Sequence, residues 1–495
     1  MRGALLGGIL GAALALLLLA PGSAVATPSL LTGFTDTDAY LRADGPDRAA
    51  ALANTRRARG SIARVVVSWA DIAPMPPPSP AAAADPAWEG YSWDQLDSAV
   101  RDIAASGLRP LINFYRAPPW AEGGGRPPVS ERVPSGTWKP SVQAYGRFSR
   151  AAAERYSGRF PDPGRPGRPL PRVRYWQAWN EPNLSTYLNP QWRRRGGRFV
   201  PASPTLYRHL LNSFYRGVKS ASRGNRVISG GTSPFGDPWR GGRRIPPALF
   251  TRAWLCLSGA RRLRPVRCSG SPSRFDAIAH HPYAVFSPLV SAQNRDDVKM
   301  ADIRRKLVRP LRAAIRAHKV SRRHGLQVWA TEFSWDTRPP DPDGLSLGRH
   351  ARYIQAGLYT LWRQGVDVAL NFKLRDDPRG SAWKVTFQSG PFFRGPSAAA
   401  DTPKPALTAF RFPFTAYRRR GVATLWGLAP GAGTVTIASR RGSRWRRVVR
   451  LRAGRNRVFV ARRRIRKGTL LRARMGPDTS MDFRVGPSEA PKPRP

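Results

Sequence analysis

Two glutamates follow short apolar runs that contain tryptophan, and their positions suit acid–base chemistry. Glu181 comes after residues 175–179 and is preceded by Asn180, while Glu332 comes after residues 328–331. Cleavage of a glycosidic bond uses two carboxyl groups, because one protonates the departing oxygen while the other attacks the anomeric carbon or activates water. We therefore take Glu181 and Glu332 as the candidate catalytic pair.

The rest of the chain alternates short β-rich runs with longer amphipathic stretches, which is typical of a parallel α/β protein. Strands are predicted at residues 31–35, 63–68, 109–115, 173–179, 226–230, 275–280, 327–331 and 367–372. Helices are predicted at residues 92–106, 142–156, 205–220, 303–318 and 348–364. This pattern predicts a (β/α)8 TIM barrel. The alternative is an open doubly wound sheet, but that fold normally has a Gly-rich turn after its first strand, and residues 33–36 do not form one.

In such a barrel, side chains at the carboxyl ends of the strands meet at one face and carry the chemistry. Glu181 ends the fourth predicted strand and Glu332 ends the seventh, so we expect the two carboxylates to face each other across the mouth. Their separation decides the mechanism, since about 5 Å permits direct attack by a carboxylate and about 7–9 Å leaves room for a water. The sequence does not measure that distance.

These strand ends resemble glycoside hydrolase clan A, and the chain is similar to families 5 and 39 of that clan over roughly residues 31–414. The resemblance implies that Asn180-Glu181 is the clan's Asn-Glu pair, with Glu181 as acid/base and Glu332 as the nucleophile of a retaining hydrolase. It implies that Asn180 binds the sugar 2-hydroxyl, and that the substrate is a poly- or oligosaccharide. No metal or organic cofactor is required for this chemistry.

Further strand ends agree with the resemblance. Arg64 resembles the second-strand Arg beneath the nucleophile, and His281-Pro-Tyr283 resembles the sixth-strand His-x-Tyr whose Tyr contacts the nucleophile. The eighth strand departs from the clan, because many members have a Trp under the sugar there and this chain has Asn-Phe-Lys-Leu at residues 371–374, with Trp383 a little further on. The sequence leaves open which aromatic residue lies under the sugar. The full set of expected substrate-binding residues is Asn180, Arg64, Trp69, Tyr115, Trp120, His281, Tyr283, Trp335 and Trp383.

Two other functions use the same scaffold. A non-catalytic, lectin-like barrel would bind glycans without needing two facing glutamates, so the retained pair disfavours it. A transglycosylase would use the same residues and would differ only in the acceptor of the second step.

The chain divides into four predicted segments. Residues 1–26 resemble a cleaved signal peptide, because Arg2 precedes an apolar stretch shorter than the about 20 residues of a membrane span. Residues 27–415 form the catalytic barrel, 416–485 a small basic antiparallel β-sandwich of the immunoglobulin-like kind, and 486–495 a disordered tail. We expect a secreted protein, extracellular or cell-wall associated, with no transmembrane span after cleavage.

The two cysteines, Cys256 and Cys268, are close in sequence within a chain predicted to be exported. A local disulfide is favoured, and a metal site is disfavoured because no histidine flanks them at ligand spacing.

The formal net charge of the chain is +52, from 83 Lys and Arg against 31 Asp and Glu. Such a charge raises the possibility of nucleic-acid binding, but an exported chain without a nucleic-acid-binding motif argues against it. No Asp or Glu occurs between Thr402 and Pro477. The basic C-terminal module is therefore a candidate for contact with an anionic cell-wall polymer, with a purely structural cap as the alternative.

Overall fold

The computed structural model describes residues 29–321, 327–380 and 382–486. The predicted signal peptide at 1–26, and the predicted tail beyond residue 486, lie outside the described residues. Among the described helices, none is long and apolar enough to cross a membrane.

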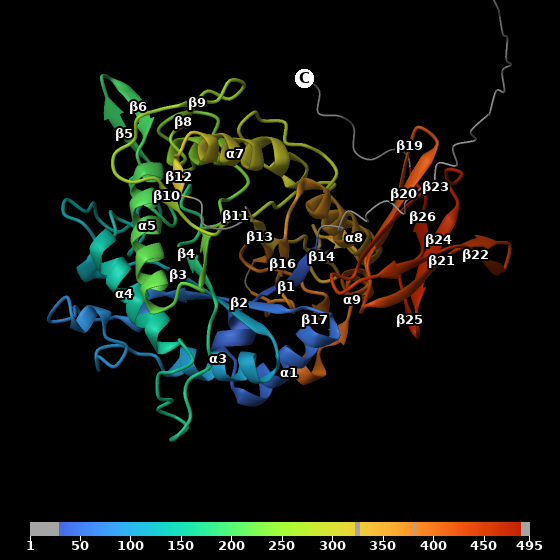
Figure 1. The fold of residues 1–495 in the computed structure, drawn as a ribbon, viewed down its shortest axis with the longest axis horizontal. Helices are drawn as coiled ribbons and strands as arrows, with labels where there is room; N and C mark the ends of the chain where they lie inside the picture. Colours follow the sequence, from blue (N-terminus) through green and yellow to red (C-terminus); the bar gives the residue numbers. More distant parts are fainter. Residues whose placement is uncertain (1–28, 322–326, 381, 487–495) are drawn as a thin grey trace, which may run out of the picture.

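Eight parallel strands close into a barrel at the centre of the larger domain (Figure 1). They are β1 (Leu31–Thr35), β2 (Ile62–Ser68), β3 (Arg109–Tyr115), β4 (Tyr175–Ala178), β7 (Arg226–Ser229), β11 (Ala277–His280), β13 (Gln327–Phe333) and β16 (Val368–Phe372). The barrel is closed because β1 pairs with β2 on one side and with β16 on the other. The predicted (β/α)8 barrel is confirmed, and the open doubly wound sheet is excluded.

At least one α-helix follows each barrel strand along the chain, and the main ones cover the outside of the barrel. These are α1 (Gly45–Arg57), α3 (Asp94–Ala105), α4 (Val142–Arg155), α5 (Ser203–Ala221), α6 (Pro247–Trp254), α7 (Arg309–Arg316), α8 (Leu347–Gln364) and α9 (Pro405–Arg411). The helix predicted at 303–318 is instead a π-helical turn at Arg304–Val308 followed by α7. Gly365 ends α8 in the left-handed conformation, with φ of 84°, as a C-terminal glycine commonly does.

The inside of the barrel has two layers. The amino-terminal halves of the strands point apolar side chains inward, among them Ile62, Leu111 and Trp329. Two residues further along the same strands, the inward positions are Arg64, Asn113 and Thr331, because alternate residues of a strand face the same side. An apolar plug therefore fills one end of the barrel and a buried polar layer lies at the carboxyl ends of the strands.

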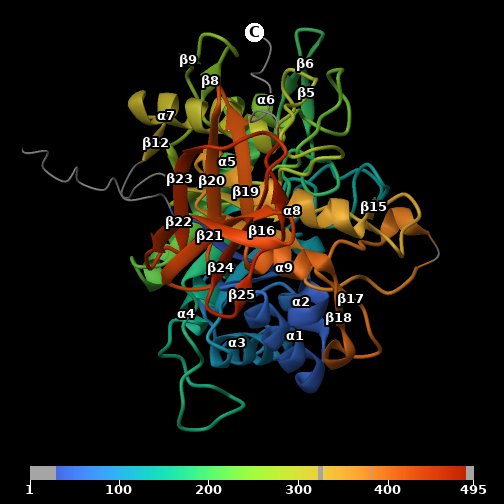
Figure 2. The same ribbon diagram turned by 90° about the vertical axis from the view of Figure 1, so that its right-hand side faces the viewer.

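Two antiparallel sheets follow the barrel (Figure 2). One contains β19 (Phe414–Arg419), β20 (Val422–Leu428) and β23 (Val458–Arg464). The other contains β22 (Arg444–Ala453), β21 (Gly433–Arg441), β24 (Leu470–Met475), β25 (Asp478–Thr479) and β26 (Phe483–Arg484). The module begins at Phe414, slightly before the predicted boundary at 416, because β19 is its first strand and pairs with β20.

Aromatic side chains fasten this module to the barrel. Tyr359 and Trp362 lie on α8, and Trp426 on β20 packs against both, with ring centroids 5.5 and 5.7 Å apart. Tyr417 on β19 stacks on Tyr359 at 5.1 Å. The module therefore covers a helix of the barrel with apolar surface.

Cys256 and Cys268 form the predicted disulfide, with an S–S distance of 2.04 Å. The bond closes a short hairpin of β8 (Leu257–Ser258) and β9 (Arg264–Pro265), which follows α6.

We predict that Trp426→Ala lowers the free energy of unfolding by about 3–5 kcal/mol, since it removes a fully buried aromatic side chain. Denaturant unfolding measures the loss. Trp445→Ala is the matched control, because Trp445 lies on β22 and stacks on Arg472 without being fully buried. Equal losses for the two variants would contradict the interface.

Candidate active site

The turn after β4 aims Glu181 at the barrel axis. Trp179 and Glu181 both have positive φ, 70° and 37°, which is uncommon for residues other than glycine. Hydrogen bonds hold this turn on both sides. The Trp179 amide donates to Phe114 O at 2.9 Å, the Asn113 side chain donates to Trp179 O at 2.8 Å, and the Glu181 amide donates to Gly231 O at 3.0 Å.

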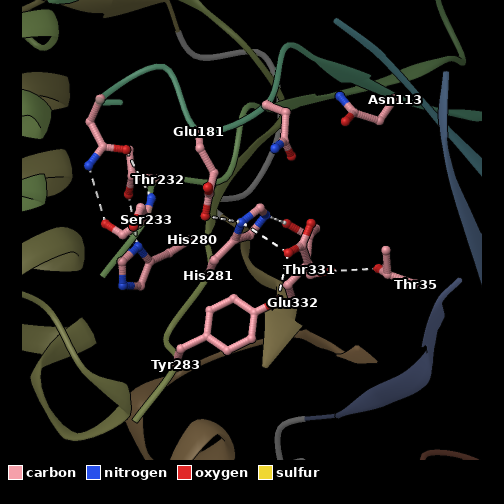
Figure 3. A network of polar contacts seen from close by, with 12 residues as sticks. Thr35, Asn113, Glu181, Thr232, Ser233, His280, His281, Tyr283, Thr331 and Glu332 are labelled. Carbon is pink, nitrogen blue, oxygen red and sulfur yellow. Dashed lines mark hydrogen bonds and ion pairs between the residues drawn. The ribbon is translucent and has the colours of Figure 1, made fainter. Parts of the chain in front are cut away.

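Glu332 lies on β13, and its carboxylate meets that of Glu181 around His281 (Figure 3). One oxygen of each carboxylate and a ring nitrogen of His281 all lie within 4.8 Å of one another. His281 Nδ1 is 2.9 Å from Glu181 Oε1 and 3.5 Å from Glu332 Oε2, while its Nε2 is 3.0 Å from Thr331 Oγ1. The two carboxylates are thus close enough to act on one atom from two sides.

Arg64 on β2 is the hub of the polar layer. Its guanidinium donates to Glu332 Oε1 and to Gln177 Oε1, each at 2.6 Å. Its remaining nitrogen donates at 3.0 Å to the side-chain oxygens of Asn113 and Asn180. Because Arg64 is fully buried, these four contacts satisfy a charge that has no access to water. Arg64 therefore orients Glu332 and Asn180 instead of contacting a ligand itself.

Glu332 is held as a carboxylate. Burial alone would raise its pKa, but the neighbouring His281 and Arg64 and the hydrogen bonds from Tyr283 and Arg64 bring the pKa below its usual value. The Tyr283 hydroxyl donates to Glu332 Oε2 at 2.8 Å, so both oxygens of this group have donors.

Glu181 has the opposite balance. Burial raises its pKa, and the negative charge of Glu332 adds to the shift, although the contact with His281 opposes it. The net pKa lies above the usual value. One buried pair therefore contains an ionised carboxylate beside a carboxyl group that retains its proton to higher pH, which is the arrangement that pairs of acid and nucleophile use.

The donor set also bears on metal binding. Glu181, His281 and Glu332 are spaced as three ligands could be. However, Arg64 already supplies a positive charge to Glu332 at 2.6 Å, and His281 is in hydrogen-bond contact with Glu181. These contacts occupy the ligand atoms that an ion would need.

The predicted aromatic residues divide into buried and partly open ones. Trp69 is fully buried against Phe148 and Tyr145, so its predicted contact with substrate is wrong. Trp335 packs on Tyr353 and is about as buried as Asn180, so its contact with substrate stays a prediction.

The other three aromatic candidates are half-buried. Trp120 packs its ring edge on Trp69 and donates from Nε1 to Ala73 O at 2.9 Å, while Trp383 lies in a short 3-10 turn. Tyr115 packs on the ring of Tyr187 at 5.8 Å.

Several site residues were missed from the sequence. Gln177, Asn113 and Thr331 join the polar layer, and the two-residue period along each strand was the signal that could have identified them. Phe372 on β16 lies against Tyr283, with ring centroids 6.3 Å apart, and against Phe387 at 4.9 Å. Phe372 therefore lies beside the tyrosine that donates to Glu332.

No protein-family model and no curated protein sequence matches the chain. Among solved structures, the fold is similar to a family 39 glycoside hydrolase from the gut symbiont Bacteroides cellulosilyticus WH2, with a TM-score of 0.51 and 16% identity over 86% of this chain and 80% of that one.

Weaker similarities extend to two other enzymes. One is the GH39 enzyme from Xanthomonas axonopodis pv. citri, with a TM-score of 0.47 and 14% identity over 90% of this chain and 92% of that one. The other is a hyperthermophilic beta-glucosidase from Pyrococcus furiosus, with a TM-score of 0.43 and 13% identity over 77% and 94% of the two chains. At 16% identity, the similarity to the first of these structures shows the barrel fold alone.

We predict that Arg64→Met destabilises the fold by about 3–5 kcal/mol at neutral pH, because it leaves Glu332 buried without its cation. The lowered pKa of Glu332 means that its pairing stabilises the fold above the ordinary glutamate range and that this contribution is lost as pH falls. The difference between wild type and variant should therefore shrink on acidification, as measured by denaturant unfolding across pH. Arg64→Met combined with Glu332→Gln is the control, and a loss equal to that of Arg64→Met alone would contradict the coupling.

Proposed function

We propose that this protein is a retaining glycoside hydrolase acting on a poly- or oligosaccharide. The observation that carries the proposal is the Glu181–Glu332 pair. One oxygen of each carboxyl group lies within 4.8 Å of the other, and the two pKa values are shifted in opposite directions. Retaining enzymes have carboxyl groups about 5–5.5 Å apart, whereas inverting enzymes separate them by about 6.5–9.5 Å to admit water. The similarity of the fold to a family 39 enzyme accords with the same assignment.

In the first step, Glu332 attacks the anomeric carbon while Glu181 gives its proton to the departing glycosidic oxygen. This forms a glycosyl–enzyme ester and releases the first product. Glu181, now a carboxylate, takes a proton from water, and the resulting hydroxide displaces Glu332 from the anomeric carbon. Glu332 leaves as a carboxylate and Glu181 is again protonated, so the net change is addition of one water.

Neighbouring residues would support the substrate during these steps. Asn180 turns its side-chain oxygen to Arg64 at 3.0 Å, which leaves its amide nitrogen to donate to the sugar 2-hydroxyl. Phe372, through its place beside Tyr283, is a better candidate than Trp383 for the surface under the reacting sugar. The eighth-strand aromatic would then be present as Phe instead of Trp.

The two alternatives make different demands on the site. Glycan binding by a lectin-like barrel does not require a carboxyl group of raised pKa beside an ionised one. A transglycosylase would share every residue and would only prefer a sugar over water in the second step. Release of reducing sugar from a panel of polysaccharides distinguishes hydrolysis from both.

We predict that Glu332→Gln lowers turnover by several orders of magnitude without unfolding the protein, because the nucleophile is lost. Glu181→Ala should act similarly on poor leaving groups, but azide should restore part of the rate on an activated aryl glycoside, since that leaving group needs no proton. Steady-state rates and circular dichroism measure both effects. Near-normal turnover of Glu332→Gln would contradict the assignment of Glu332 as the nucleophile.

We further propose that the protein is secreted and that its C-terminal module contacts an anionic surface. Residues 416–485 contain 20 Lys and Arg against two Asp. The exposed edge strand β22 presents Arg446, Arg447 and Arg450 to solvent. The aromatic contacts with α8 favour the structural cap as the module's first role, and the two roles are compatible.

We predict that replacing these three arginines with Gln weakens the retention of the protein on an anionic polysaccharide at low salt and leaves its thermal stability unchanged. The effect on retention should disappear at high salt, because exposed charges are screened beyond about 8 Å at physiological ionic strength. Column retention across a salt series measures this. If wild type and variant elute at the same salt concentration, the module acts as a structural cap only.

A further inference from the structure

Two adjoining hollows lie on the flank of the barrel, outside the catalytic cluster. The first has a volume of about 590 Å³ and the second about 520 Å³, and both are of the size that small ligands fill. They share Arg252, Ala260, Arg295 and Asp296, so the two hollows are direct neighbours. Neither is lined by Glu181 or Glu332.

The disulfide-closed hairpin contributes lining residues to both hollows. Residues 257–260 line the second, and Ala260, Arg261 and Leu263 line the first. The hairpin of β5 (Trp192–Arg195) and β6 (Arg198–Pro201) borders the second hollow through Trp192 and Pro201. Both hairpins stand at the same end of the molecule (Figures 1 and 2). The Cys256–Cys268 bond closes the first of these hairpins at its base.

The first hollow is strongly basic. Six of its lining residues are Arg or Lys and one is Asp. That one carboxylate, Asp296, is paired with Arg252 at 2.9 Å. Arg261 and Arg295 are exposed and have no acidic partner among the described residues. A guanidinium is a planar fork that matches carboxylate, sulfate or phosphate oxygens, so this hollow is suited to an anion.

The second hollow adds an aromatic surface. Trp239 follows β7 and is 63% exposed, which is unusual for so large an apolar side chain. Arg295 lines this hollow as well as the first, so a ligand in contact with Trp239 would lie near a guanidinium. The C–H face of a pyranose ring is apolar and packs well on an indole, while its acidic substituent would face the arginine.

From these features we propose a second, non-catalytic binding site for an acidic saccharide. Trp239 receives a sugar ring, and Arg261 and Arg295 bind the acidic groups of that chain. The site goes beyond the proposed hydrolysis, since it needs neither catalytic glutamate. It would keep a chain of acidic sugars on the barrel flank whether or not the barrel cleaves it.

Titration calorimetry of the full chain tests the site without any need for turnover. The probe is trigalacturonate, and its methyl ester is the matched neutral ligand with the same sugars. A sulfated trisaccharide run in parallel tells whether carboxylate or sulfate is the preferred acidic group. We expect the acid to bind and the ester to bind at least about tenfold more weakly, because charge-assisted hydrogen bonds are lost.

The variants separate this site from the general basic charge of the chain. Arg261→Ala with Arg295→Ala should weaken trigalacturonate binding by about tenfold or more. Arg262→Ala with Arg264→Ala removes the same number of charges from the hairpin that contains Arg261, at positions outside both hollows. It should change binding by less than about twofold. Trp239→Ala should also weaken the binding of trigalacturonate. All these residues are exposed, and unchanged thermal unfolding confirms folding.

Three results would overturn the proposal. Equal losses in the two double variants would assign binding to overall charge, and equal affinity for acid and ester would remove the role of the guanidinium groups. The third result is a single-stranded oligonucleotide that binds as tightly as trigalacturonate and whose binding is lost when Arg261 and Arg295 are replaced. That result would show a polyanion site without selectivity for sugar.

Discussion

The arrangement of the active site depends on one buried arginine. Arg64 lies inside the barrel with no contact with water, so its charge has to be matched by a carboxylate and its nitrogens by acceptors. Glu332 supplies the charge at 2.6 Å, and Gln177, Asn113 and Asn180 supply the remaining acceptors. These residues come from β13, β4, β3 and the turn after β4, so the barrel must close for the network to form.

Closure of the barrel also explains why the pKa values of the two glutamates are shifted in opposite directions. Glu332 lies within the network, where Arg64 and Tyr283 both donate to it. Glu181 lies at its edge, where burial and the charge of Glu332 favour the protonated form. One group is therefore stabilised as an anion and the other as an acid, although both side chains are chemically the same. The difference arises from which strand end each residue occupies.

Much of this arrangement could be predicted from the sequence because strand ends in a barrel converge. The eight strands follow from hydrophobic periodicity, and the glutamate pair follows from residues placed just beyond two of the runs. The contacts of Arg64 and Tyr283 with the nucleophile were implied by the resemblance to clan A. Trp69 was predicted wrongly for a local reason. The chain turns into the short helix α2 (Trp69–Ile72) directly after β2, and this places the indole among Phe148 and Tyr145 in the core. No pattern of residue types reveals that turn.

The separation of the carboxylates could not be predicted for a similar reason. It depends on the positive φ of Trp179 and Glu181 and on backbone hydrogen bonds from residues distant in sequence, such as Gly231. The most direct test of the account is therefore the stereochemistry of the reaction. Proton NMR of the first product released from the aryl glycoside that the enzyme cleaves fastest should show the anomeric configuration of the substrate retained. An inverted product, or no cleavage of any glycoside in a broad panel, would contradict the account.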